Sequence, residues 1–239
     1  MSLIMSACKK KSATPEDKGY SYSDYQVGSY VIYDVDSTFY DDFFVPTKVI
    51  TTKFRLKEKV ASFYYDNQNR LTARIERYIK PYDSNTPYDS IPWQLKNVWA
   101  ANNTNDRNER IEENVRFVKL HFPIYKNKVW DENIHNVNSE KNLTFKQVDY
   151  SDSIGTILFD SLVQTEFDDG GQILTQRNYS TEKYAKNIGL VYKQEINVTS
   201  QPDPNATTSE LQIFYGQSIL DRITSGYQYT WTVNSYGKE

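Results

Sequence analysis

The chain of 239 residues is poor in several residue types, and each shortage excludes a class of structure or site. It has one cysteine, which excludes an intrachain disulfide and any cysteine-based metal centre. It has two histidines, His121 and His135, and no His-Glu-x-x-His, Gly-x-Ser-x-Gly or Gly-x-Gly-x-x-Gly motif. No apolar run approaches the roughly 18 residues of a membrane-spanning helix. We therefore expect no cofactor and no metal site of a familiar kind.

Net charge is also low. Lys and Arg number 28 against 31 Asp and Glu, which gives a formal charge of -3. A nucleic-acid-binding domain carries a basic surface that neutralises phosphates, and nothing in this balance supplies one. We expect no nucleic-acid partner.

Aromatic residues are abundant, with 20 Tyr, 11 Phe and 4 Trp. Tyrosine and phenylalanine favour the pleated, half-buried surface of a β-sheet. Tyrosine also places an apolar ring inward and a hydroxyl outward, which suits wet faces and interfaces. These rings therefore either pack a β core and its rim or form a binding platform for a sugar or peptide.

From Gly28 onward the hydrophobic pattern has mostly a period of two. Residues 48–65 and 71–79 alternate on either side of the polar stretch 66–69, which predicts a hairpin. Many strands at short spacing predict a mainly β protein. Its antiparallel sheet would curve into a barrel, half-barrel or sandwich, with one or two short helices. No composition shift divides the chain, so residues 28–239 form a single β-rich domain in this interpretation.

Several connections can be predicted in more detail. A turn at 102–106 leads into one return strand through 111–122, and 126–142 reads as a long loop. Residues 180–186 have the composition of a short helix capped by Ser180 or Thr181. Residues 211–223 fit either a helix or an irregular segment, because Gly216 weakens the helical pattern.

The N-terminal stretch Leu3–Cys8 resembles the end of a bacterial lipoprotein signal peptide. In that motif, an aliphatic residue and two small residues precede the cysteine that is acylated, and here Met5, Ser6 and Ala7 occupy those positions. A secretory signal has an apolar stretch of about 7–15 residues, longer than the one before Cys8. We interpret residues 1–8 as the remnant of a signal peptide with a lipobox, and Cys8 as the site of lipidation.

Residues 9–27 begin with three lysines and continue as a polar stretch without periodicity. Such a composition is typical of a flexible tether. Lysines beside an acyl chain also favour anionic lipid headgroups. The expected partner is thus a membrane, reached through acylated Cys8. A cysteine that lies by chance in a polar tail is the alternative.

Three segments resemble a group of Bacteroidetes cell-envelope lipoproteins without an assigned activity. They are ENVRFVKLHFP (Glu113–Pro123), KVWDEN (Lys128–Asn133) and EKYAKNIGLVYKQ (Glu182–Gln194). The last segment is also similar to one in periplasmic half-barrel proteins whose curved sheet holds an apolar guest. The resemblance implies a lipoprotein of the Gram-negative outer membrane, facing the periplasm or the cell surface. It implies no catalytic residues.

Clustered acids offer the other candidate chemistry. Asp34 and Asp36 alternate on one face of an expected strand and could offer oxygens to Ca²⁺. However, no Asp-x-Asp-x-Asp-Gly loop occurs, and exposed acids commonly protect strand edges. They are weak metal candidates. A glycosidase would need two carboxylates opposed across a cleft, which the sequence neither identifies nor excludes.

The favoured hypothesis is a non-enzymatic envelope lipoprotein that acts as a binding or assembly module. It would bind a protein, a glycan or an apolar ligand through a curved sheet face or through the region of Trp93, Trp99 and Trp130. One alternative is a glycan-active hydrolase with an unassigned carboxylate pair. Another is a structural subunit of an envelope complex with a tyrosine-rich interface.

Overall fold

A computed structural model describes residues 17–171 and 173–239 of the protein. The described residues form one antiparallel sheet of twelve strands. The strands are β1 (Ser29–Asp41), β2 (Lys48–Tyr65), β3 (Leu71–Pro81), β4 (Gln94–Asn103), β5 (Arg107–Glu112), β6 (Val115–His121), β7 (Val129–Asp131), β8 (Asn142–Ile154), β9 (Ile157–Asp168), β10 (Gln176–Ala185), β11 (Gly189–Thr199) and β12 (Ser225–Lys238).

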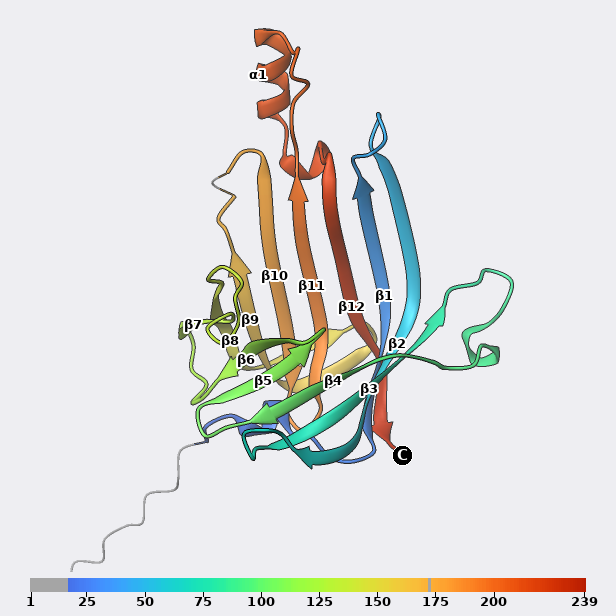
Figure 1. The fold of residues 1–239 in the computed structure, drawn as a ribbon, viewed down its shortest axis with the longest axis vertical. Coiled ribbons are helices and arrows are strands. Elements are labelled where there is room, and N and C mark those ends of the chain that lie inside the picture. Colours follow the sequence, from blue (N-terminus) through green and yellow to red (C-terminus); the bar gives the residue numbers. More distant parts are fainter. Residues whose placement is uncertain (1–16, 172) are drawn as a thin grey trace, which may run out of the picture.

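Neighbouring strands in the sheet are also neighbours in the chain, except at one place. The spatial order runs from β6 down to β1, then β12, and then back from β11 to β7. The first and last strands therefore pair at the centre of the sheet, with Ser29 opposite Lys238. Figure 1 shows β1, β2 and β9–β12 standing upright, while β3–β6 cross in front of their lower half.

This curvature brings the two edges of the sheet together. The Val118 amide of β6 donates to the Glu132 carbonyl just after β7, with an N–O distance of 2.9 Å. The Trp130 indole of β7 donates to the Val118 carbonyl at 2.9 Å. The fold is thus mainly β, with a sheet nearly closed into a barrel, as the alternating pattern and aromatic content predicted.

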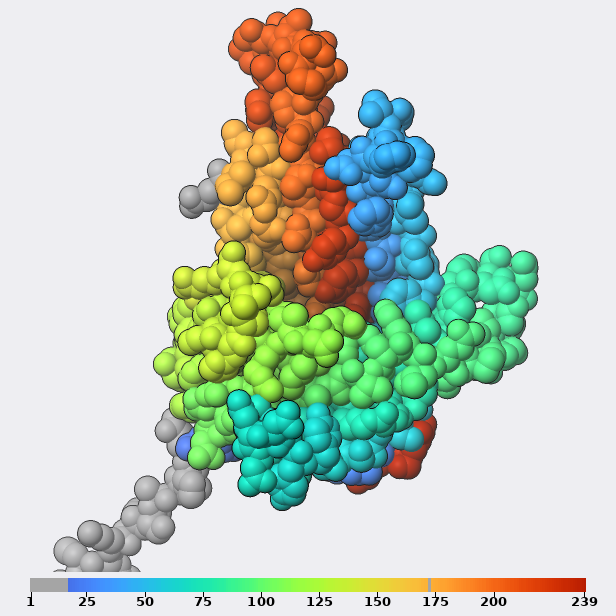
Figure 2. All heavy atoms as spheres, in the orientation of Figure 1, coloured from blue at the N-terminus to red at the C-terminus, as the bar shows by residue number. Residues whose placement is uncertain are grey.

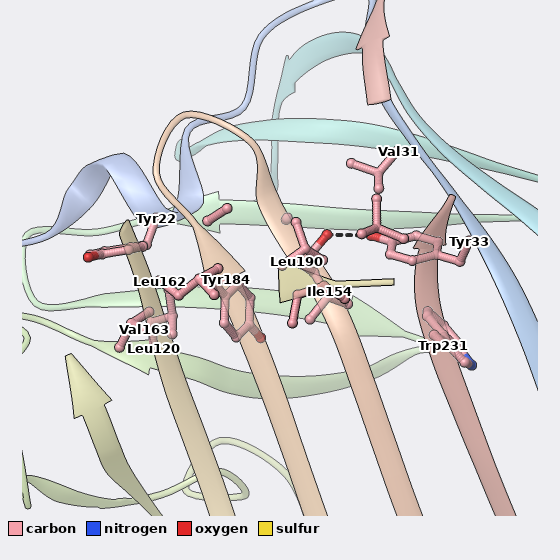
Figure 3. Packing of buried hydrophobic residues seen from close by; sticks show 14 of the residues in the cluster. Tyr22, Val31, Tyr33, Leu120, Ile154, Leu162, Val163, Tyr184, Leu190 and Trp231 are labelled. Carbon is pink, nitrogen blue, oxygen red and sulfur yellow. Dashed lines mark hydrogen bonds between the residues drawn. The ribbon is translucent and has the colours of Figure 1, made fainter. Parts of the chain in front are cut away.

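The core fills the lower half of the molecule, where the crossing strands cover the upright ones. Inward-facing side chains of both sets meet there (Figure 3), because alternate residues of a strand point to the same side. Tyr33 is 1% exposed, and its hydroxyl donates to the Leu190 carbonyl at 2.8 Å. A buried hydroxyl needs such a partner, since an unsatisfied one costs free energy.

The predicted hairpin of β2 and β3 is confirmed. Its turn is held by the Asp66 carboxylate, which accepts from the amides of Gln68 and Arg70 at 2.9 Å. Asn69 occupies the left-handed region with φ 57°, a conformation that asparagine tolerates. Polar turn chemistry therefore identified this connection correctly.

Three local predictions were wrong. The return strand expected through 111–122 is two strands, because Glu113 and Asn114 both have positive φ and form a tight turn. The loop expected at 126–142 contains the short strand β7. Where a helix was expected at 180–186, residues 180–185 belong to β10, which pairs on both sides and so overrides local helix propensity.

The ambiguous segment near residue 211 is helical. The helix α1 (Thr208–Gly216) starts with a capping box between Thr207 and Glu210 and projects beyond the strands (Figure 1). Short 3-10 helices η1 (Tyr20–Ser23), η2 (Tyr88–Ser90) and η3 (Ile219–Asp221) complete the elements. No helix in 17–171 or 173–239 is both long and apolar enough to cross a membrane.

The segment 17–27, which the sequence placed in a tether, belongs to the folded part. Within it, η1 buries Tyr22 to 2% exposure. The Tyr22 hydroxyl lies 2.8 Å from Ser161 Oγ and donates to Asp149 Oδ1 at 3.2 Å. Tyr22 was not recognisable as a core residue, because the polar residues around it have no strand or helix period. The predicted lipidation site Cys8 lies outside the described residues.

Candidate functional site

Eight charged side chains lie inside the curved sheet, above the apolar core. We call them the ion-pair layer; no side chain in it is more than 13% exposed. The layer has four cations and four carboxylates: Arg77, Arg110, Lys119, Lys193, Glu58, Glu112, Glu132 and Glu182. They come from β2, β3, β5, β6, β10, β11 and the residue that follows β7.

One half of the layer is built on arginine. Arg77 Nε lies 3.0 Å from Glu58 Oε1, and Arg110 Nη2 lies 2.9 Å from Glu58 Oε2. The ring of Trp99 stacks on both guanidiniums, with its centroid 3.4 Å from that of Arg77 and 5.2 Å from that of Arg110. Arginine suits this place because its flat, weakly hydrated guanidinium can stack and ion-pair at the same time.

The other half is built on lysine. Lys119 Nζ lies 2.6 Å from Glu132 Oε1 and 3.6 Å from Glu182 Oε1, and Lys193 Nζ lies 3.2 Å from the same Glu182 oxygen. Burial alone would raise the pKa of Glu182, but Lys119 and Lys193 outweigh burial and lower the pKa well below its usual range. Burial would also raise the pKa of Glu132, but Lys119 outweighs burial and lowers this pKa as well.

Such a layer adds little to stability. The cost of removing charges from water offsets most of the attraction between them. Hydrophobic residues of the same volume often give a protein of equal or higher stability. Each carboxylate is nevertheless matched by a cation, so the charges are fixed in place. The layer can therefore serve as a rigid polar floor for whatever lies above it.

Above this floor, the molecule opens into a cleft of about 450 Å³. The upright strands β9–β12 rise past the crossing strands, and Figure 2 shows the resulting step between the lower band and the taller wall. A small cavity of about 20 Å³ reaches Lys119, Lys193 and Glu182. It shares four lining residues with the cleft: Glu132, Lys141, Ser180 and Glu195. The cleft is lined by Phe117, Glu132, Asn133, Asn138, Ser139, Glu140, Lys141, Phe167, Asn178, Tyr179, Ser180, Glu195, Ile196, Asn197 and Tyr227.

Tyr227 of β12 lines the cleft, and Tyr229 of the same strand packs behind it. The rings of Tyr227 and Tyr229 are stacked, with centroids 5.9 Å apart and planes 7° apart. Both hydroxyls donate to the Glu195 carboxylate, that of Tyr227 at 2.9 Å. Burial and the Glu195 charge raise the pKa of Tyr227 to about 12, so the phenol stays protonated. The Tyr227 ring is therefore held rigidly against the cleft.

The cleft also offers uncommitted polar groups. The side-chain amides of Asn138 and Asn178 and the hydroxyl of Ser180 make no hydrogen bond to another residue of the described chain. Of its charged lining groups, Glu132, Glu140 and Glu195 are acidic and Lys141 is basic. The cleft can thus exchange hydrogen bonds with a neutral ligand and disfavours an anionic one.

The three tryptophans singled out in the sequence lie apart from this cleft. Trp130 is 6% exposed and packs on Phe145, with ring centroids 4.4 Å apart. Trp99 is 9% exposed within the ion-pair layer, and its indole donates to Glu113 Oε1 at 3.1 Å. Trp93 is half-buried beside Lys80, whose Nζ is 4.6 Å from the ring centroid. Their role in binding stays a prediction.

The weak metal candidates are engaged with cations. Asp34 Oδ1 lies 2.8 Å from Arg55 Nε, and Asp36 Oδ1 lies 2.8 Å from Lys53 Nζ. Elsewhere in the described chain, no group of three His, Cys, Asp or Glu side chains is arranged to hold a metal ion. His121 contacts the Phe122 carbonyl at 3.2 Å, whereas His135 lies 3.7 Å from Glu109.

Sequence reasoning missed both the ion-pair layer and the cleft. Lys193 and Glu195 occupy alternate positions of β11, and Tyr227 and Tyr229 occupy alternate positions of β12. The alternation was visible, but which face is buried depends on how the whole sheet curves. The sequence signal for the ion-pair layer is that its charged residues occupy strand positions that face the core. Charged residues are usually exposed, so the sequence alone assigns them to the solvent side.

Comparisons with known proteins add one structural likeness. No protein-family profile matches the chain, and no curated protein sequence matches it significantly. A solved structure from Bacteroides fragilis, described as an exported protein with a YmcC-like fold, superposes with a TM-score of 0.44 at 11% identity. The alignment covers 90% of this chain and 97% of the other.

Proposed function

We propose that the protein is a lipid-anchored, non-enzymatic module of the outer membrane that binds a neutral glycan in the open cleft. The observation that carries this proposal is the composition of the cleft: aromatic rings, neutral amides and hydroxyls above a fixed polar floor. Ligand sites of this size combine apolar walls with a few convergent polar groups. The anchor would be acylated Cys8, as the lipobox-like stretch suggests.

The lining favours a glycan over an apolar guest. Phe117, Phe167 and Tyr227 offer ring faces for the C–H faces of a sugar, while Asn138 and Asn178 offer amides to its hydroxyls. An apolar guest would cover those amides without giving them hydrogen-bond partners, which costs free energy. The excess of acids over Lys141 argues against an acidic sugar.

The carboxylates fit binding better than hydrolysis. A glycosidase needs one carboxylic acid with a raised pKa and a second opposed to it. Here the lysines of the floor lower the pKa values of Glu132 and Glu182. Glu195 is held by two tyrosine hydroxyls. Glu132 and Glu182 are therefore arranged to stay charged, and Glu195 is held in one orientation.

The proposal can be tested with a glycan array, followed by calorimetric titration of the best ligand. Tyr227→Ala should weaken binding at least about tenfold, because the stacking face is lost. Tyr227→Phe keeps that face and should bind nearly as the wild type does. Tyr125→Ala, at a 55% exposed tyrosine outside the cleft, is the matched control.

Three results would overturn the proposal. They are no glycan bound by the wild type, equal binding by Tyr227→Ala, or cleavage of the bound glycan during incubation, which would indicate the hydrolase instead. The anchor needs a separate measurement, by mass spectrometry of protein extracted from its own membrane. An unmodified Cys8 there would contradict lipid attachment and leave the glycan site unaffected.

A second candidate function is that of a structural subunit, and one observation favours it. The tip of the β1–β2 hairpin exposes Phe43 to 87% and Val45 to 98%, and it lies away from the crossing strands β3–β6 (Figure 1). Exposed apolar groups at a protruding tip often mark a contact with another protein. Cross-linking in membranes should then capture a partner that Phe43→Ser loses, while glycan binding by this variant stays unchanged.

A further inference from the structure

A second pocket, on a different part of the molecule, has the opposite charge character. It holds about 300 Å³ and is lined by Gln68, Arg70, Arg107, Glu109, Arg116 and His135. Its lining has three guanidiniums and one carboxylate, so basic side chains outnumber acidic ones along its wall. It shares no residue with the cleft. We call it the arginine pocket.

Glu109 forms the base of the arginine pocket. Its side chain is 1% exposed, and its two oxygens accept from all three arginines. Arg107 Nε lies 2.7 Å from Oε1 and Arg70 Nη1 lies 3.1 Å from Oε2, while Arg116 Nη1 also bonds Oε2. The buried carboxylate therefore fixes the guanidiniums without reaching the pocket opening.

The arginines retain donors that this network does not use. Arg116 makes a single side-chain hydrogen bond to the described chain, from Nη1 to Glu109, although a guanidinium has five N–H donors. Arg107 uses Nε and Nη1 but not Nη2. Arg70 and Arg107 also pair with Asp66 and Asp106, but neither aspartate lines the pocket. The side chains of the three arginines are 21–26% exposed, so solutes can reach them.

We propose that the arginine pocket binds a phosphate group. The guanidiniums come from three separate places: the β2–β3 turn, β5 and β6. Donors arriving from three directions match a tetrahedral anion with several acceptor oxygens better than a flat carboxylate with two. Arginine forks bind phosphate with charge-assisted hydrogen bonds, which are the stronger kind.

The phosphate could belong to a lipid headgroup or to a solute. The first described residues run beside this region: the Lys18 carbonyl accepts from the Ile124 amide at 3.1 Å. Tyr20 also donates to the Asn105 carbonyl, close to Arg107, at 2.8 Å. If the chain is anchored ahead of these residues, as proposed above, the pocket lies at the membrane-proximal end. The anchor bears only on whether the phosphate belongs to a lipid, and phosphate binding by the pocket does not depend on it.

The first arm of the test titrates inorganic phosphate into the full chain at low ionic strength, because screening weakens such contacts. The wild type should bind phosphate. Arg116→Gln should bind it at least about tenfold more weakly, because a charged donor set is lost. Arg116→Lys keeps the charge but not the fork and should also lose affinity. The matched control Arg74→Gln removes an exposed arginine outside the pocket and should bind as the wild type does.

The second arm identifies the source with phosphatidylcholine vesicles that contain or lack phosphatidic acid. A headgroup site predicts flotation only with phosphatidic acid, lost in Arg116→Gln and competed by inorganic phosphate. Phosphate binding without flotation assigns the pocket to a soluble phosphate. The proposal is overturned if the wild type binds neither probe, or if folded Arg116→Gln binds both as the wild type does. Thermal melts establish that each variant is folded, and the glycan titration is independent of either result.

Discussion

The ion-pair layer and the arginine pocket place buried carboxylates in two different settings. In the layer, four carboxylates meet four cations, and no side chain is more than 13% exposed. In the pocket, one carboxylate meets three guanidiniums that are 21–26% exposed. The layer is closed to solvent, because its charged groups are buried and paired with one another. The pocket is open, because its arginines are partly exposed and keep N–H donors that their carboxylate partners do not use.

The difference teaches what each charge cluster can do. Removing one member of a buried network with equal numbers of cations and carboxylates costs much stability. Such a network keeps few free donors or acceptors for a ligand, so it acts as a support. A cluster whose cations contact solvent keeps donors for a ligand, and removal of one of these exposed cations costs little stability. Four substitution and titration experiments can break or sharpen this distinction.

The largest effect is expected from Glu182→Gln. Lys193 would lose its 3.2 Å partner and Lys119 one of its carboxylates, which leaves positive charge buried without compensation. We expect the free energy of unfolding to fall by about 3–5 kcal/mol, measured by urea denaturation. Glu140→Gln at the cleft rim is the control and should change it by less than about 0.5 kcal/mol. Equal effects of the two would show that the layer is not closed.

Glu109→Gln should cost less, about 2 kcal/mol in the same measurement. Glu109 is buried, but its three arginines can turn to water when the charge is lost. A loss as large as that of Glu182→Gln would mean that the pocket is as closed as the layer, and the contrast would fail.

Acid should destabilise the layer. Burial opposes ionisation of Glu112, Glu132 and Glu182, but the neighbouring lysines outweigh it and lower each pKa below 4.5 in the folded protein. The unfolded chain therefore takes up these protons first, and stability falls as pH drops below about 5. In that range, Glu182→Gln should show a slope shallower than the wild type by up to about 1.4 kcal/mol per pH unit. Parallel slopes in urea titrations at several pH values would contradict this assignment.

The smallest effect is expected from Arg116→Gln, because two other arginines still hold Glu109. The free energy of unfolding should fall by less than about 1 kcal/mol, as for other partly exposed ion pairs. Thermal denaturation would show this as a shift of a few degrees at most. A larger shift would make Arg116 a structural residue rather than a donor held for a ligand.

Strand content and the antiparallel class were predictable, because they depend on local alternation. The turn at Asp66–Asn69 was recognisable for the same reason, since asparagine and aspartate favour such turns. Residues 180–186 were misread as a helix because Glu, Lys and Ala suit one. Pairing of β10 with both β9 and β11 overrode this preference.

The candidate site could not be predicted, because it depends on curvature. Phe117 and Tyr227 line one cleft but are more than a hundred residues apart in the chain. Burial of Glu182 beside Lys119 depends on the meeting of the two sheet edges near Val118 and Glu132. The tryptophans drew attention by residue type alone, and two of them pack inside. A one-dimensional pattern shows which residues alternate, but not which face the bending sheet encloses.

The pairing of β1 with β12 gives β12 an unusual weight in the sheet. In most proteins, loss of a terminal strand trims an edge, but here β12 lies between a block of six strands and a block of five. Without it, no ladder joins β1 to β11, and the cleft loses Tyr227 together with the ring stacked on it. The sheet is therefore completed only by its last strand. Removal of residues 225–238 would open the sheet between β1 and β11 rather than trim one of its edges.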